Sequence, residues 1–223
     1  ACNPHNMLLP VLLTCLLYAV AAQSEAPVAK WPSQFRVGFN ETTKIIWTRK
    51  TTGVMWYDAA TGTEVVERLD GNGDRYCGSI HPLTHTPCRH VVVNSNRYLI
   101  FPDLDECCLC CTAAQGCGIL DPNWLSDAEY QGTEVKQSVS AYKFSKPGLQ
   151  KNYYWTTADD AQLPVELDQV PNDLMTFHLD TFTEIPAIDP ALLEIPADCH
   201  TRCPISSVCT LAANHKSDVA AAK

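Results

Sequence analysis

The chain has 223 residues, of which 46% are hydrophobic, and it carries a formal net charge of −9 with an isoelectric point near 5.1. A surface that binds nucleic acid or an anionic membrane requires concentrated basic side chains, so this charge balance argues against both partners. The length fits one larger β domain or two small ones, and no repeat, low-complexity tract or linker divides the sequence.

The first predicted element is an apolar run at residues 7–22, which is too short to span a bilayer comfortably and ends in small residues. Such a run is typical of a secretory signal peptide that is cut near Ala21 or Ala22. We therefore expect residues 1–22 to be removed and residues 23–30 to form a flexible N-terminal segment. The mature chain is then secreted, has no membrane span and folds in an oxidising compartment.

Short segments with alternating apolar residues follow, which predicts a mostly β domain at residues 31–210 and a flexible tail at residues 211–223. The pattern favours an antiparallel meander of roughly ten strands. Two short helices are expected at residues 122–128 and 189–194, the second with Asp189 before a proline. The predicted strands are residues 35–39, 43–49, 53–58, 63–69, 75–80, 90–93, 97–101, 139–144, 152–156, 165–169 and 175–182.

One glycosylation sequon lies near the start of the domain, at Asn40-Glu41-Thr42. In an exported chain the asparagine of such a sequon is a glycan acceptor on the surface. We therefore expect Asn40 to be exposed, between two strands, and to carry a glycan.

The sequence DGNGD places Asp70, Asn72 and Asp74 at alternate positions, as in the first half of an EF-hand calcium loop. The second half does not match, because Arg75 and His81 stand where the loop requires glycine and glutamate. Glycine and asparagine favour left-handed backbone, so the segment predicts a tight hairpin connection without metal. A weak calcium site at the three side chains is the alternative.

Cysteine is unusually dense, with four of the 12 cysteines in the block CCLCC at residues 107–111. Cys2 and Cys15 leave with the leader, and an even number remains, as complete pairing requires. Adjacent cysteines rarely pair, so the block is expected to join several segments, with at least one bridge to the distant tail, worth about 4 kcal/mol. The cysteines predicted to form disulfides are Cys77, Cys88, Cys107, Cys108, Cys110, Cys111, Cys117, Cys199, Cys203 and Cys209.

Zinc is the competing explanation for these cysteines, because the block contains two C-x-x-C spacings and tail cysteines would complete a four-sulfur site. The two spacings overlap out of phase by one residue, and no glycine lies between Cys107 and Cys111 to form a knuckle turn. In a secreted protein we therefore favour disulfides.

The sequence contains none of the common catalytic motifs: no G-x-S-x-G elbow, no H-E-x-x-H and no nucleotide-binding glycine loop. The paired acids Asp159 and Asp160 lie in polar sequence that is typical of a solvated turn. We predict no enzymatic activity, no catalytic residue and no cofactor.

Aromatic residues are frequent on the predicted strands. Their alternate spacing places several of them on one face of a sheet, where they either fill a core or line an apolar pocket for a lipid-like ligand. The candidate ligand-binding residues are Trp47, Trp56, Phe144, Tyr153, Trp155 and Phe177.

The order of several short segments between residues 31 and 209 resembles the ependymin-related proteins and their protist relatives. The segments are DGNGDRYC at 70–77, Pro87-Cys88, RYLIFP at 97–102 before the cysteine block, GLQKNYY at 148–154, Pro171-Asn172-Asp173, residues 175–182, and Ile195-Pro196 before Cys199. The CCLCC block, Cys203 and Cys209 exceed the usual number of cysteines in that family.

The resemblance implies a secreted, glycosylated and disulfide-bonded protein. It implies two stacked, curved antiparallel sheets, similar to the bacterial lipoprotein carriers, with a hydrophobic pocket; some members of the family are associated with calcium and lipid. It also implies that Cys199 is bridged to an earlier strand.

We therefore expect a non-enzymatic protein whose partner is a hydrophobic small molecule or lipid. The alternative is a structural subunit of an extracellular coat, matrix or fibre, in which exposed sheet edges or cysteines mediate self-association.

Overall fold

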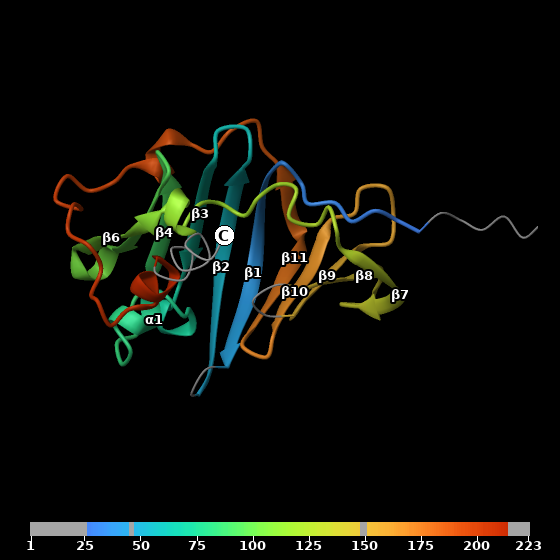
Figure 1. The fold of residues 1–223 in the computed structure, drawn as a ribbon, viewed down its shortest axis with the longest axis horizontal. Helices are drawn as coiled ribbons and strands as arrows, with labels where there is room; N and C mark the ends of the chain where they lie inside the picture. The colour runs from blue at the N-terminus through green and yellow to red at the C-terminus, as the bar shows by residue number, and fades with distance from the viewer. Residues whose placement is uncertain (1–25, 45–46, 148–150, 214–223) are drawn as a thin grey trace, which may run out of the picture.

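The computed structural model describes residues 26–44, 47–147 and 151–213. Strands dominate it, as the alternating sequence pattern predicts (Figure 1). The strands are β1 (Gln34–Lys44), β2 (Thr48–Asp58), β3 (Thr63–Arg68), β4 (Cys88–Val93), β5 (Asn96–Phe101), β6 (Glu106–Thr112), β7 (Glu129–Lys136), β8 (Val139–Lys146), β9 (Lys151–Thr157), β10 (Pro164–Val170) and β11 (Asp173–Glu184).

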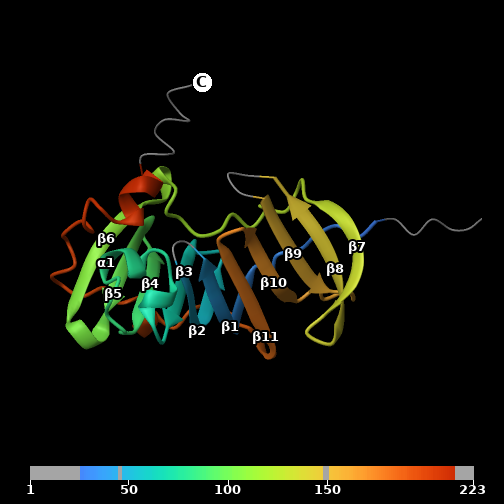
Figure 2. The same ribbon diagram turned by 90° about the horizontal axis from the view of Figure 1, so that it is seen from below.

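All of these strands belong to one curved antiparallel sheet with the order β6-β5-β4-β3-β2-β1-β11-β10-β9-β8-β7 (Figure 2). The sheet consists of two meanders, β1 to β6 and β7 to β11, that meet where the first and last strands pair. The two edge strands, β6 and β7, are therefore consecutive in the sequence. Their connection, residues 113–128, crosses one face of the sheet from edge to edge (Figures 1 and 2).

The prediction of two stacked sheets is wrong, because the two meanders are hydrogen-bonded to each other. The pairing of β1 with β11 runs from Phe35 opposite Glu184 to Thr43 opposite Asp173, with one irregularity between Arg36 and Gly38. The second layer over each face consists of connecting segments and the C-terminal tail instead of a second sheet.

β1 is continuous across the sequon, so the predicted break between residues 39 and 43 is also wrong. Phe35, Val37, Phe39 and Glu41 alternate toward one buried face, which we call the inner face. Asn40 points to the opposite face and is exposed, as predicted, although it lies within a strand. A strand with one solvated face accommodates polar residues there, which explains why a polar sequon does not end it. Glycan attachment stays a prediction.

The helical segments differ from those expected. The predicted strand at 75–80 is the short helix α1 (Cys77–Ile80), preceded by the 3₁₀ turn η1 (Gly71–Gly73). The predicted helix at 122–128 consists of turns, and the one at 189–194 is the 3₁₀ turn η4 (Pro190–Leu193), capped by Asp189. Two further 3₁₀ turns flank β6, namely η2 (Pro102–Leu104) and η3 (Ala113–Gln115), and residues 208–213 are helical.

The start of the tail packs on the face opposite to the inner one, where Ile188 joins a cluster with Val65 and Val91. The chain then passes along the free edge of β6: the Leu109 amide donates to the Thr201 carbonyl, and the Cys203 amide donates to the Leu109 carbonyl. Residues 203–213 end on the inner face, against Leu99 and Cys108. The tail therefore wraps around one edge of the sheet and covers its unpaired backbone groups.

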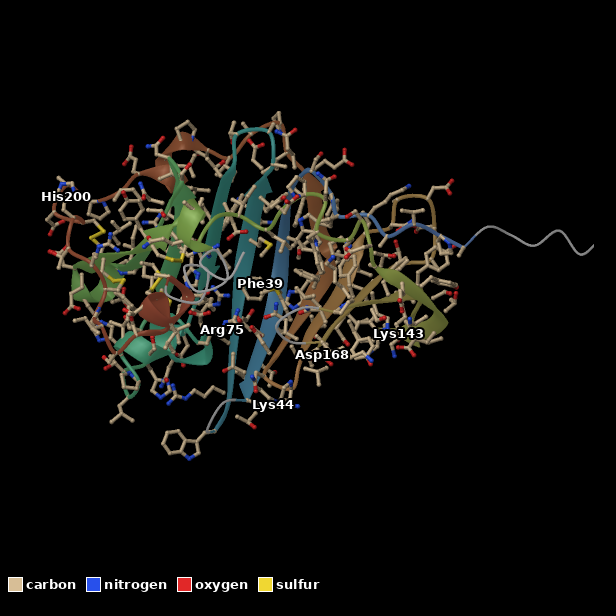
Figure 3. The ribbon with its side chains drawn as sticks, viewed as in Figure 1. Phe39, Lys44, Arg75, Lys143, Asp168 and His200 are labelled. Carbon is tan, nitrogen blue, oxygen red and sulfur yellow. A yellow bond between two sulfur atoms is a disulfide. The ribbon has the colours of Figure 1, made fainter. Side chains whose placement is uncertain are left out.

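Five disulfides fix this arrangement, and they gather near the β6 end of the sheet (Figure 3). Three of them join β6 to the tail, which confirms the predicted bridge to the distant group. Successive side chains of a strand point to opposite faces, so neighbouring cysteines of β6 reach parts of the tail on opposite faces. The pairs are Cys77–Cys88, Cys107–Cys199, Cys108–Cys203, Cys110–Cys209 and Cys111–Cys117.

These pairs account for all ten cysteines predicted to be bridged, which leaves none of them for the zinc alternative. The block joins two segments, the tail and the start of the edge-to-edge connection, instead of several strands.

The expected signal peptide at 1–22 lies outside the described residues. Residues 26–30 have no regular secondary structure, and residues 211–213 of the expected tail belong to the last helical turn. Among the described residues, no helix has the length and apolarity needed to cross a membrane.

Candidate functional site

The inner face carries an aromatic core that is built from both meanders. Phe35, Phe39 and Tyr57 come from the first meander, and Phe144 and Phe177 come from the second. Gly53 allows Phe39 to lie directly over β2, because a Cβ there would stand 2.7 Å from the Phe39 ring. The core thus lies across the junction of β1 and β11.

Two segments outside the sheet close this core. Tyr57 donates a hydrogen bond of 2.7 Å to the Leu120 carbonyl, which holds the edge-to-edge connection above the sheet. Arg97 donates to the carbonyls of Cys117 and Gly118, at 3.2 and 2.9 Å. The N-terminal segment contributes Trp31, which is only 8% exposed.

Trp31 is the central contact of the closed core. Its ring lies between 5.4 and 6.2 Å, centroid to centroid, from the rings of five other aromatic residues. These distances are typical of favourable edge-to-face contacts, so Trp31 fills the space between the inner face of the sheet and the edge-to-edge connection. The five residues are Phe35, Tyr57, Trp124, Tyr154 and Phe177.

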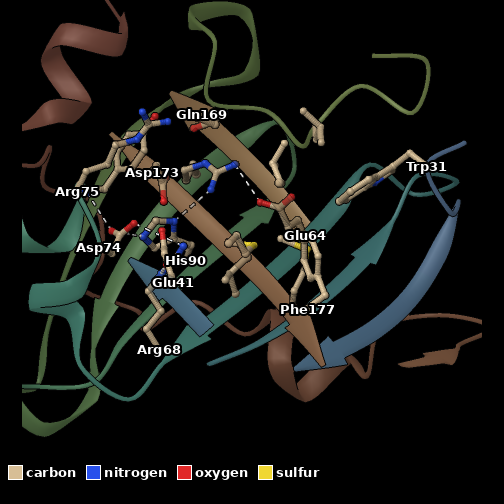
Figure 4. Close-up of a pocket in the computed structure, with 17 residues that line it drawn as sticks. Trp31, Glu41, Glu64, Arg68, Asp74, Arg75, His90, Gln169, Asp173 and Phe177 are labelled. Atoms are coloured by element: carbon tan, nitrogen blue, oxygen red, sulfur yellow. Dashed lines mark hydrogen bonds and ion pairs between the residues drawn. The ribbon is translucent and has the colours of Figure 1, made fainter. Parts of the chain in front are cut away.

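Beside Trp31 lies a cavity of about 150 Å³ whose two ends differ in chemistry. Figure 4 shows Trp31 and Phe177 at one end and charged side chains at the other. The apolar end is completed by Met55, Val66, Leu120, Leu167 and Met175. The charged end is formed by Glu41, Glu64, Arg68, Asp74, Arg75, His90, Arg97 and Asp173, together with Gln169.

Arg68 organises the charged end. Its Nε donates to Glu41 at 2.5 Å, its Nη2 lies 3.5 Å from Asp74, and its guanidinium carbon lies 5.4 Å from the centre of the Phe39 ring. Arg68 and Glu41 are 6% and 2% exposed. A buried guanidinium persists only when it is paired, so the position of Arg68 depends on the acidic side chains around it.

Asp74 is held as a carboxylate. It accepts hydrogen bonds from the amides of Tyr76 and Cys77, at 3.0 and 2.7 Å, and these bonds also begin helix α1. Burial alone would raise the pKa of Asp74, but Arg68, the hydrogen bond from His90 and the backbone donors hold this pKa well below its usual range.

His90 is neutral and donates to Asp74. Arg97 can only donate, and its Nη1 lies 3.2 Å from His90 Nδ1, so the ring proton resides on Nε2, 3.0 Å from Asp74 Oδ1. Burial lowers the pKa of His90 to about 4, although Asp74 opposes this shift. At neutral pH, Asp74 is therefore a carboxylate and His90 a neutral donor, and their protonation states match the hydrogen bond between them.

Glu41 is the exception, because burial, Asp173 and Asp74 raise its pKa to about 8 against the opposing effect of Arg68. Burial also raises the pKa of Asp173. At neutral pH, Glu41 therefore retains a proton, which reduces the repulsion among the three neighbouring acids.

The substitution Glu41→Gln is expected to remove most of the loss of stability between pH 6.5 and pH 8. The folded-state pKa of Glu41, about 8, exceeds its ordinary value of 4.5, so folding retains a proton and stability falls as the pH rises through this interval. His90 gives the opposite slope, but only between about pH 4 and its ordinary pKa of 6.5. We expect the wild type to lose about 2 kcal/mol. Guanidinium denaturation at the two pH values measures the difference, and equal losses in both proteins would contradict the assignment.

Of the six aromatic residues predicted to bind a ligand, only Phe177 lines the cavity, and Phe144 is buried in the adjoining core. Trp56, Tyr153 and Trp155 lie at alternate strand positions that face away from the inner face. Trp47 follows β1 and is 66% exposed. Sequence reasoning missed Trp31, the crossing connection and most of the charged end, of which only Asp74 had been singled out, as a possible calcium ligand.

The candidate calcium residues form separate contacts. Asp70 Oδ2 lies 2.6 Å from His85 Nδ1, Asn72 Oδ1 accepts from Arg49, and Asp74 belongs to the buried network. Asp70 also accepts from the Asn72 amide at 2.9 Å and thereby caps η1. The segment therefore forms a capped turn before α1 instead of a hairpin connection, and calcium binding stays a prediction.

Comparison with known proteins gives no family assignment: no family model and no curated protein matches the sequence. An uncharacterized conserved protein from Thermus thermophilus is 10% identical, with a TM-score of 0.48 over 76% of this chain and 90% of that one. A LolA superfamily protein from Nitrosomonas europaea is 7% identical, with a TM-score of 0.35 over 74% and 92%.

A chain of the MucA/MucB complex from Pseudomonas aeruginosa is 12% identical, with a TM-score of 0.39. The alignment covers 75% of this chain and 57% of that one, so this protein spans just over half of the length of that chain. Similarities of this size identify neither a family nor a ligand, and the ependymin resemblance stays a prediction.

Proposed function

We propose that this protein is a secreted, non-enzymatic carrier that binds a hydrophobic or lipid-like ligand on the inner face of its sheet. The observation that carries the proposal is the position of Trp31, which lines both the inner cavity and an outer groove of about 710 Å³. The groove runs between residues 28–34, the turn at 122–126 and the end of β11. Displacement of one side chain would join the two spaces into a site large enough for a chain-like ligand.

With Trp31 between the cavity and the groove, several buried polar atoms have no hydrogen-bond partner among the described residues. Within the described residues, Trp31 Nε1, Trp124 Nε1 and the Tyr154 hydroxyl are buried without a hydrogen-bond partner, and the three rings contact one another. Each such atom costs about 1–3 kcal/mol. Movement of Trp31 would relieve part of this cost, which makes an open state accessible to a ligand.

Export and glycosylation are parts of the same proposal. Five disulfides are typical of a protein that folds in an oxidising compartment, and Asn40 is exposed as a glycan acceptor must be.

The alternative, a structural subunit of a coat or fibre, has less support. The tail covers the β6 edge, and all ten described cysteines are paired within the chain. The other edge strand, β7, carries charged residues and a bulge between Tyr130 and Gly132, which are common protections against edge-to-edge association.

Solvent extraction of the native protein followed by mass spectrometry tests the carrier function, and we expect a stoichiometric apolar ligand. In the delipidated protein, Trp31→Ala is expected to strengthen binding of the neutral dye Nile red by about tenfold, because it joins the cavity to the groove. Val66→Phe, which extends a larger side chain into the cavity, is expected to weaken binding by a similar factor.

Trp56→Ala is the matched control, since it removes the same side chain from the opposite face of the sheet and should leave dye binding unchanged. Circular dichroism establishes that each variant is folded. A native protein without extractable ligand, together with dye binding that none of the three substitutions alters, would refute the carrier function.

A further inference from the structure

We propose that the charged end of the cavity selects an amphiphile with an uncharged hydroxyl head group, bound with the hydroxyl between Arg68 and Asp173. This inference rests on the proposed carrier function and specifies the ligand class of the same site. It follows from the hydrogen-bonding groups that the buried network leaves unused, and from the charges around them.

Two buried polar atoms at this end have no partner among the described residues. Arg68 Nη1 is a donor, and Asp173 Oδ1, on the carboxyl group that also hydrogen-bonds Glu41, is an acceptor. Both residues line the cavity, and Arg68 is only 6% exposed (Figure 4). A buried guanidinium N–H and a buried carboxylate oxygen are costly to leave unpaired, so a group that satisfies both gains binding energy there.

A hydroxyl group is the smallest ligand group with the required chemistry, because it accepts one hydrogen bond and donates another. In the complex that we propose, it accepts from Arg68 Nη1 and donates to Asp173 Oδ1. A hydrocarbon terminus would leave both atoms unpaired.

Charged head groups fit less well. A carboxylate or phosphate could accept from Arg68, but it would be buried next to Asp74 and Asp173, and it offers no proton to Asp173. An ammonium group could donate to Asp173, but it would be buried next to Arg68 and would leave Nη1 unpaired. The existing ion pairs already balance Arg68, so an uncharged head group adds no unpaired charge.

The size of the cavity sets the portion of the ligand that fits while Trp31 remains in place. A cavity of about 150 Å³ lined by apolar side chains is large enough for a single benzene ring. The apolar end here, with Met55, Val66 and Phe177, would accept one ring or a short alkyl segment next to the head group. Any longer tail would continue past Trp31 into the outer groove.

Four compounds of one shape separate the head groups: benzyl alcohol, toluene, benzylamine and benzoate, titrated into the delipidated wild-type protein at pH 6.5 and followed by NMR. We expect benzyl alcohol to bind about tenfold more tightly than toluene, and the two charged compounds to bind more weakly than toluene. Because this series uses the wild type, it does not depend on whether a variant folds.

Asp173→Ala removes the acceptor and should eliminate the preference for benzyl alcohol over toluene, while toluene still binds. Asp168→Ala, on the neighbouring strand and outside the cavity lining, is the control and should keep the preference. Equal binding of toluene and benzyl alcohol, or tighter binding of either charged compound, would overturn the head-group assignment but not the carrier function. Binding of none of the four would overturn the assignment, and the extraction experiment would then decide the carrier function separately.

Discussion

Removal of all three disulfides between β6 and the tail, by six Cys→Ala substitutions, is expected to lower the free energy of unfolding by about 9 kcal/mol. The first of these crosslinks closes a loop of more than 90 residues, since the sequence separations are 92, 95 and 99. Such a loop is worth about 4–5 kcal/mol through the reduced entropy of the unfolded chain. The combined loss is comparable to the total stability of a typical domain, so we expect this variant to be unfolded.

Removal of only Cys108–Cys203 should cost much less, about 2 kcal/mol, because the bridges on either side still close the long loop and this one closes only a few additional residues. The effects are therefore expected to be larger together than the sum of the separate losses. Non-reducing guanidinium denaturation measures the loss in the variants that stay folded, and circular dichroism shows whether the triple variant is unfolded. Removal of Cys111–Cys117, with a separation of 6 residues, is the control for a short loop and should also cost about 2 kcal/mol. Three equal single losses that add up to the combined loss would contradict this entropic account.

Arg68→Met is expected to destabilise the protein by about 3–5 kcal/mol, because it leaves the buried Asp74 carboxylate without its cation and the buried Glu41 carboxyl group without its hydrogen-bond donor. Methionine retains most of the apolar length of the side chain, so the loss reports mainly on charge. The same substitution at Arg89 is the control. Arg89 lies 3.8 Å from Glu67 near the surface, and its loss should cost less than about 1 kcal/mol.

The double variant Arg68→Met, Glu41→Gln should recover part of the loss, since it removes one of the carboxyl groups left without a partner. Thermal or guanidinium denaturation of the four proteins completes the cycle. If the double variant is no more stable than Arg68→Met, the two side chains do not form the coupled pair that the geometry shows.

Strands β8 to β11 of the second meander were predicted from their short, alternating sequence segments, whereas β7, which has no buried residue, was not predicted. The predicted segments 139–144, 152–156, 165–169 and 175–182 all lie within β8 to β11. The union of the meanders into one sheet was not predictable. It depends on contacts such as Phe39 with Phe177, whose partners are far apart in the sequence and show no local signal.

The site was harder to predict than the fold. Aromatic residues were taken as candidate ligand contacts, but half of them lie on the opposite face. Apart from Asp74, the charged end was missed because Glu, Asp and Arg are normally exposed. One signal was present in the sequence: Glu41 continues the alternation of Phe35, Val37 and Phe39, which places it on the buried face of β1.

The position of β1 and β11 at the centre of the sheet has a consequence for biosynthesis. During synthesis, β1 is made early but its partner β11 begins only at residue 173, so one side of the future middle strand stays without a neighbour while most of the chain is made. An unsatisfied strand edge next to Phe39 and Val37 is a template for the last strand of any nearby copy. Folding at high concentration therefore favours dimers that exchange β11, and timely pairing of the tail cysteines favours the monomer.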